Sequence, residues 1–151
     1  MFSCFCFDRN ARIWYIYYMQ KQLKEQMGYW KKSAQKNLDA AKVLFDNKHY
    51  DSCLFFGHLA LEKIIKGLVI KQINKAAPLI HDLERLALLA KLELSEEQIK
   101  HLRTITDFNI AGRYSEIKYN FYKKCTKEYT EKNLKIIKEL FLCIEKKYQK
   151  K

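Results

Sequence analysis

The residues of this chain whose types most clearly suggest a chemical role lie in one stretch, "DFNIAGRYSEIKYNFY", at positions 107–122. Arg113 and Tyr114 stand there, in a chain with only five arginines. The planar fork of an arginine can hold two phosphate oxygens, and a tyrosine ring can stack on a nucleobase. In the alternative interpretation, Arg113 pairs with Glu62 or Asp107 to pin a loop and Tyr114 packs against neighbouring helices. The sequence leaves both interpretations open and favours the structural one.

A second group lies in the apolar segment "CLFFGHLALEKIIKGLVI", where His58, Glu62 and Lys66 are spaced four residues apart. This spacing places them in one row along a helix. If the row is buried, its polar groups must satisfy one another. A functional interpretation lets Glu62 bind a ribose hydroxyl or a base edge and Lys66 a phosphate, but a structural row is favoured. A histidine and a glutamate without a third ligand do not predict a metal site.

A third group, His81 and Asp82, directly precedes "LERLALLAKL". Asp82 is a good N-cap for the helix that this pattern predicts, with His81 as its neighbour. Ligand binding is the less favoured role for both. Further along, "SEEQ" predicts a capping box between Ser95 and Gln98.

These groups must be positioned by helices, because the chain has one proline and four glycines and is rich in good helix formers. Apolar residues recur at three- and four-residue steps. We expect helices over about 30–45, 52–73, 83–92, 96–108 and 127–148, with a bend and an irregular loop after the fourth. The prediction is an all-α protein, an antiparallel up-and-down bundle of four to five helices.

We expect residues 19–151 to form a single domain. The first 18 residues, rich in aromatics, are expected to be a disordered extension or to result from a start site assigned too early. Their apolar run "IWYIYYM" is far shorter than the roughly 20 residues that a membrane span needs, so no membrane association is predicted.

The net charge and the cysteine content indicate which partners and which cellular compartment to expect. The net charge is +12, and the excess is nearly all lysine. Such a surface attracts RNA non-specifically, but solvated lysine faces are the favoured interpretation. The five cysteines are odd in number and contain no C-x-x-C pair. This pattern predicts a reducing compartment, and we expect a cytoplasmic protein.

Four features in this order resemble the HEPN domain, the nucleotide-binding helical domain of prokaryotes and higher eukaryotes. They are "YWKKSAQKNLDAAKVLFDNKHYDSCLFFGHLALEKIIKGLVI", "HDLERLALLAKL", "FNIAGRY" and the closing lysine-rich amphipathic helix. The resemblance implies a helical bundle, often a homodimer, that commonly works beside a small nucleotidyltransferase. Many members are toxins that cut RNA through an arginine followed four to six residues later by a histidine.

This chain departs from that pattern, because no histidine follows Arg113 and all four histidines precede it. Our hypothesis is therefore a non-catalytic HEPN-type module without a metal or a resident cofactor. It would bind a nucleotide such as ATP, or a nucleotidyltransferase partner, and the candidate ligand-binding residues are Arg113, Tyr114, Glu62, Lys66, His81 and Asp82. One alternative is a divergent metal-independent ribonuclease in which His81 or His101 approaches Arg113 in the fold. Another is a purely structural interaction subunit, as in a toxin–antitoxin pair.

Overall fold

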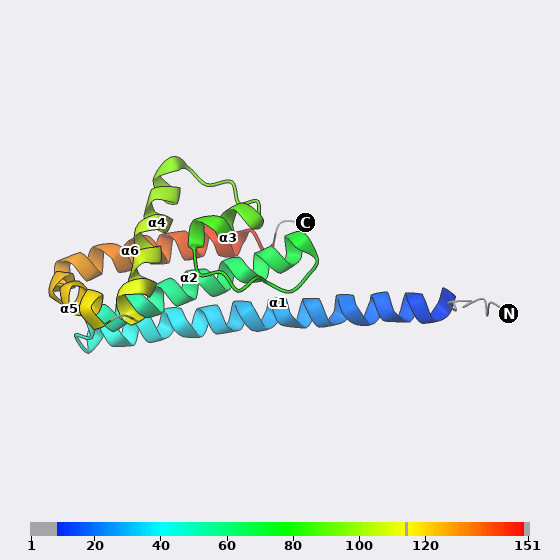
Figure 1. Ribbon diagram of the computed structural model, residues 1–151, viewed down its shortest axis with the longest axis horizontal. Coiled ribbons are helices and arrows are strands. Elements are labelled where there is room, and N and C mark those ends of the chain that lie inside the picture. Colours follow the sequence, from blue (N-terminus) through cyan, green and yellow to red (C-terminus); the bar gives the residue numbers. More distant parts are fainter. Residues whose placement is uncertain (1–8, 114, 150–151) are drawn as a thin grey trace.

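The chain folds into six helices, described by a computed structural model over residues 9–113 and 115–149 (Figure 1). The side chains of Arg9 and of residues 111–117 also lie outside this description. Within the described residues there is no strand, so the predicted all-α class is confirmed. The helices are α1 (Arg9–Asp46), α2 (Tyr50–Ile73), α3 (Leu83–Leu89), α4 (Glu96–Arg113), α5 (Ser115–Lys124) and α6 (Lys127–Lys146).

The centre of the bundle is α2, which packs against α1, α3, α4 and α6. Its sequence is apolar almost all round, the pattern of a helix that is covered on every side. Leu54, Leu61, Ile64 and Ile65 on this helix have no exposed surface. The apolar stripe of α1 supplies Ala34, Leu38 and Ala41, each at most 5% exposed, and α6 contributes the buried residues Ile137, Phe141 and Ile144.

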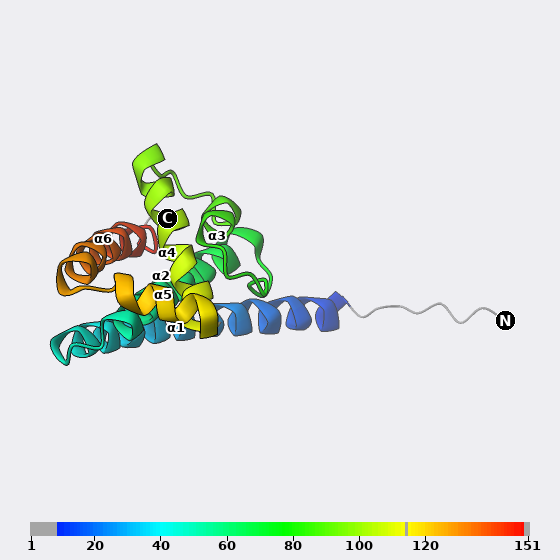
Figure 2. The ribbon, with the colours of Figure 1, turned by 60° about the vertical axis from the view of Figure 1, so that its left-hand side comes forward.

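Helix α1 is much longer than expected. It begins at Arg9 rather than near Trp30, so residues 9–18, which we expected to be a disordered extension or the result of a start site assigned too early, are helical. The N-terminal part of α1 extends past the other helices (Figures 1 and 2). Its apolar side chains from Ile13 to Met19 are accordingly between 38% and 70% exposed. Residues 1–8 lie outside the described part of the chain.

The predicted helix starts are confirmed by their capping bonds. The Asp82 carboxylate accepts a hydrogen bond from the backbone N–H of Arg85 at 2.9 Å and caps α3. The Ser95 hydroxyl accepts from the Gln98 backbone N–H at 3.2 Å, and the Gln98 side chain accepts from the Ser95 N–H at 2.9 Å, which completes the capping box. No described helix is long and apolar enough to cross a membrane.

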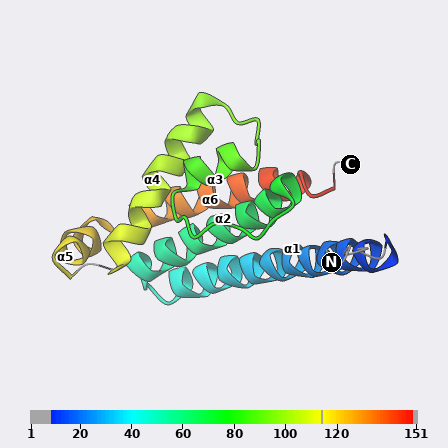
Figure 3. The same cartoon turned by 45° about the vertical axis from the view of Figure 1, so that its right-hand side comes forward.

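The expected end of the fourth helix at Phe108 and the irregular loop after it are wrong. Helix α4 continues to Arg113, and α5 follows at the end of the bundle opposite the projecting part of α1 (Figure 3). The reason is tertiary burial: Phe121 of α5 packs on Phe108 with ring centroids 5.5 Å apart, and both rings are at most 9% exposed. A ten-residue helix is marginal alone and is stabilised by such packing.

Two glycines inside helices allow a test of the packing between α2 and the C-terminal turn. A Cβ added to Gly67 would collide with the hydroxyl of Tyr148, which donates a 2.7 Å hydrogen bond to the Ile64 carbonyl. We therefore expect Gly67→Ala to lower the free energy of unfolding by about 1–2 kcal/mol. A Cβ on Gly28 of α1 meets nothing within 4 Å. We expect Gly28→Ala to raise the same quantity by about 0.5–1 kcal/mol.

Urea unfolding followed by circular dichroism measures both changes. Shifts of the two variants in the same direction would contradict this description of the contact between Gly67 and Tyr148.

Candidate functional site

Three of the residues singled out in the sequence meet at one buried carboxylate. Glu62 accepts hydrogen bonds from Lys66 Nζ at 2.7 Å and, on its other oxygen, from His58 Nε2 at 3.1 Å and His81 Nδ1 at 3.0 Å. His58 is fully buried, and Glu62 and Lys66 are at most 5% exposed. His81, whose side chain is 47% exposed, reaches the carboxylate from the loop between α2 and α3. We call these four residues the Glu62 cluster.

The Glu62 cluster also contacts two further helices. His58 Nδ1 lies 3.2 Å from the Ile105 carbonyl oxygen on α4. The Lys66 ammonium lies 5.6 Å from the centroid of the Trp30 ring on α1, within range of a cation–π interaction. The cluster therefore joins α1, α2, α4 and the loop before α3.

The electrostatics of the cluster follow from this geometry. Burial alone would raise the pKa of Glu62, but the hydrogen bonds from His58, Lys66 and His81 and the charge of Lys66 outweigh it and lower the pKa to about 2. Glu62 is therefore an ionised carboxylate whose two oxygens are both occupied. A ligand that took the place of Lys66, His58 or His81 at Glu62 would break hydrogen bonds that stabilise a buried charge.

The other residues predicted for the site lie elsewhere. Asp82 serves as the N-cap of α3. Arg113 is the last residue of α4, and its side chain lies outside the described residues, as does Tyr114. His101 and Arg113 are twelve residues apart on one continuous helix, so their backbones are separated by about 18 Å. That distance is beyond the reach of the two side chains within one chain.

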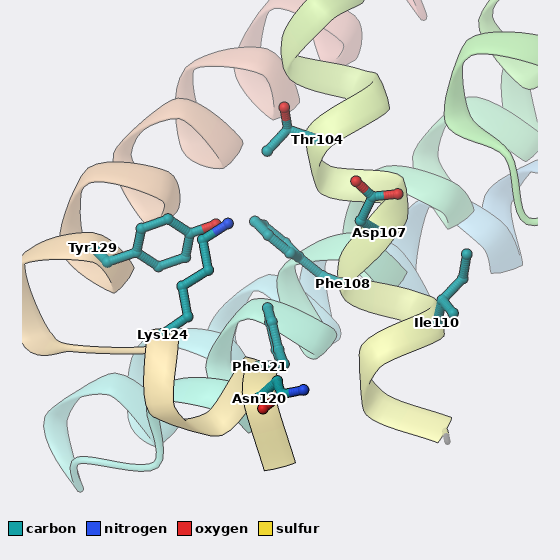
Figure 4. Close-up of a pocket in the computed structure, with 8 residues that line it drawn as sticks. All are labelled: Thr104, Asp107, Phe108, Ile110, Asn120, Phe121, Lys124 and Tyr129. Atoms are coloured by element: carbon teal, nitrogen blue, oxygen red, sulfur yellow. The ribbon is translucent and has the colours of Figure 1, made fainter. Parts of the chain in front are cut away.

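A pocket of about 340 Å³ lies between α4, α5 and the first turn of α6 (Figure 4). Phe108 and Phe121 form its floor, and the Tyr129 ring stands against Phe108 with centroids 6.5 Å apart. The Lys124 ammonium lies 5.1 Å from the centroid of the Tyr129 ring. The side chains that line the pocket are those of Thr104, Asp107, Phe108, Ile110, Asn120, Phe121, Lys124 and Tyr129.

The pocket lies next to the backbone of Arg113, the arginine of the stretch at positions 107–122. Ile110 lines the pocket and precedes Arg113 by one helical turn on α4. The sequence did not predict the pocket, because its second wall is the unexpected helix α5. The four-residue spacing of Phe121 and Cys125, both less than 10% exposed, was the available signal for an amphipathic helix there. In the part of the chain that the structure describes, no group of three or more His, Cys, Asp or Glu side chains could hold a metal ion.

Comparisons with known proteins agree with this architecture. The family model described as the HEPN domain matches residues 27–147. Among solved structures, that of TT1696 from Thermus thermophilus is similar, with a TM-score of 0.68 and 20% sequence identity. The similarity covers 81% of this chain and 98% of that one, and at this identity it shows the fold alone. A search of curated proteins finds no match.

The Glu62 cluster predicts a dependence of stability on pH. The pKa of Glu62 is about 2 in the folded chain, against 4.5 for an ordinary glutamate. The stabilisation is therefore fully present above pH 4.5 and is lost as the pH falls toward about 2. This loss amounts to about 3 kcal/mol. Urea unfolding at a series of pH values from 7 to about 2 measures it.

The variant Glu62→Gln should remove most of this pH dependence. It should also lower the free energy of unfolding at pH 7 by about 3–5 kcal/mol, because Lys66 is left buried without a countercharge. The matched control is Glu84→Gln, which breaks the exposed pair with Arg103 and should leave the stability nearly unchanged. Equal effects of the two substitutions would contradict a central role for Glu62.

Proposed function

The chain belongs to the HEPN family, and from this premise we propose that it is a nucleotide-binding member that does not cut RNA. A nucleotide such as ATP would bind at the junction of α4 and α5, with Arg113 holding phosphate oxygens. The observation that carries the proposal is the aromatic-floored pocket of about 340 Å³ that begins one turn before Arg113.

The charge around this junction supports an anionic ligand. Lys124 lines the pocket, and Lys118 and Lys123 lie on the same helix α5. The chain as a whole carries a net charge of +12, so a nucleotide approaches a positive surface. Arg113 would supply the planar fork that two phosphate oxygens match, and Tyr114, the next residue in the sequence, is proposed to stack on the base.

The positions of the histidines support a non-catalytic role. A ribonuclease of the kind that the family resemblance implies needs a histidine to move a proton near the arginine. No histidine follows Arg113 in the sequence, and His101 is separated from it by about 18 Å along α4. His58 and His81 are both engaged by the Glu62 carboxylate.

Within this proposal the Glu62 cluster and Asp82 have structural roles, because their polar atoms are occupied by other parts of the chain. The resemblance further implies a homodimer, a small nucleotidyltransferase partner and a cytoplasmic setting. These three remain predictions.

Calorimetric titration with ATP tests the proposal. We expect measurable binding, and we expect Arg113→Ala to weaken it about ten- to a hundredfold, the usual effect of losing hydrogen bonds to a charged group. Arg103→Ala is the matched control, because Arg103 lies on the same helix but pairs with Glu84 at 2.6 Å. It should leave the affinity unchanged.

Two outcomes would count against the proposal. One is that none of the common nucleotides binds to the native chain. The other is that the purified chain cuts RNA and loses this activity in Arg113→Ala, which would favour the ribonuclease alternative instead.

A further inference from the structure

We propose that the projecting N-terminal part of α1 is a membrane-surface contact that binds anionic phospholipids. We call this segment, residues 10–24, the α1 extension (Figure 1). Its apolar run is too short to span a membrane, but a helix that lies in the plane of the surface needs no such length. The proposal therefore revises the expectation that no membrane is a partner. It goes beyond nucleotide binding and does not depend on it.

The α1 extension carries a large exposed apolar surface. Seven consecutive side chains, from Ile13 to Met19, are exposed to between 38% and 70%. One is a tryptophan and three are tyrosines, which combine an apolar ring with a polar N–H or O–H. Such side chains favour the boundary between the hydrocarbon and the headgroups of a membrane. Exposed apolar patches of this size mark interaction sites, and the composition of this one fits a lipid boundary.

The outer face of the α1 extension is open to a flat partner. Leu23 and Ala41, five turns apart on α1, are both buried and mark the side of the helix that faces the bundle. Trp14 precedes Leu23 by nine residues, which places it on the opposite side, and Tyr18 lies about one turn further along that outer face. The other helices all lie on one side of α1 (Figures 1 and 3). A membrane can therefore contact Trp14 and Tyr18 without meeting the rest of the bundle.

Charge complementarity favours anionic headgroups as the occupant of this face. Residues 9–24 contain four Arg and Lys residues and no Asp or Glu. Of these, Arg12, Lys21 and Lys24 are exposed. Each basic residue near an anionic membrane surface strengthens binding about fivefold. A second copy of the chain would instead bring another net charge of +12 to the same contact and would be repelled.

RNA, another polyanion, fits the α1 extension less well. Proteins that bind single-stranded nucleic acid do so in a positively charged groove that follows the backbone. The α1 extension projects from the bundle as a single helix (Figure 2). Its aliphatic side chains Ile13, Ile16 and Met19 add to the affinity for lipid but cannot stack on bases.

Co-sedimentation with lipid vesicles tests the proposal. The native chain should bind vesicles of mixed phosphatidylserine and phosphatidylcholine at least about tenfold more tightly than vesicles of phosphatidylcholine alone, and salt should weaken the binding. The double variant Lys21→Gln, Lys24→Gln should weaken it about twentyfold. Its matched control is Lys132→Gln, Lys135→Gln, which lowers the net charge equally at exposed positions on α6 and should have a much smaller effect.

A second pair of variants tests the outer face. Trp14→Ala should weaken binding to the mixed vesicles about tenfold, because its ring leaves the lipid boundary. Ile16→Ala is the matched control: Ile16 lies seven residues before Leu23, on the bundle-facing side, and its loss should matter less. Both side chains are exposed, at 70% and 48%, so both variants should keep the fold, which circular dichroism verifies.

If the mixed vesicles bind no more tightly than the neutral ones, or not at all, the proposal is overturned. Equal effects of Trp14→Ala and Ile16→Ala would also contradict it. Two further measurements then identify the occupant. A dimer in analytical ultracentrifugation that Ile16→Ala dissociates would assign the segment to a second copy. Binding of a single-stranded oligonucleotide that Trp14→Ala abolishes would assign it to RNA.

Discussion

A single buried negative charge organises this bundle. An ionised carboxylate inside a helical core is costly unless it is paired and hydrogen-bonded, and Glu62 meets this condition through Lys66, His58 and His81. Lys66 and His58 lie on α2 with Glu62, and each of the three partners also links the cluster to a neighbouring element. His58 binds the Ile105 carbonyl of α4, Lys66 lies beside the Trp30 ring of α1, and His81 comes from the loop before α3. Hydrophobic burial drives α2 into the centre, and the Glu62 cluster then fixes how its neighbours pack around it.

The same constraint decides where a ligand can bind. The polar groups of the Glu62 cluster satisfy one another, so they offer a ligand little without a loss of stability. The candidate binding pocket lies instead at the end of the bundle, where α4 ends and α5 begins. There the aromatic rings of Phe108, Phe121 and Tyr129 leave a pocket, and the exposed side chains of Asp107 and Lys124 have no carboxylate–ammonium partner among the described residues. The Glu62 cluster and the pocket thus share no residue.

The features that could be predicted from the sequence are those that depend on local spacing. The row of His58, Glu62 and Lys66 follows from helical periodicity, and the Asp82 cap and the Ser95 capping box are bonds between residues three apart. Helix α5 offers only a short local signal, the spacing of Phe121 and Cys125, because its stability comes from the contact of Phe121 with Phe108, thirteen residues earlier. The bond from His81 to Glu62 is equally non-local, since it spans nineteen residues. The pocket, which needs three helices at once, was out of reach for the same reason.

Helix α4 connects the framework to the candidate site. The Ile105 carbonyl that contacts His58 lies only two residues before Asp107 and three before Phe108, both of which line the pocket. One turn of a helix is about 5.4 Å, so the His58 contact and the pocket floor lie within about one turn of the same helix. The hydroxyl of Thr106, which accepts a 3.1 Å hydrogen bond from the Leu83 N–H, holds the same turn to the start of α3. The buried charge at Glu62 therefore bears on the proposed binding site without lining the pocket, because its cluster contacts the helix that carries both the pocket residues and Arg113.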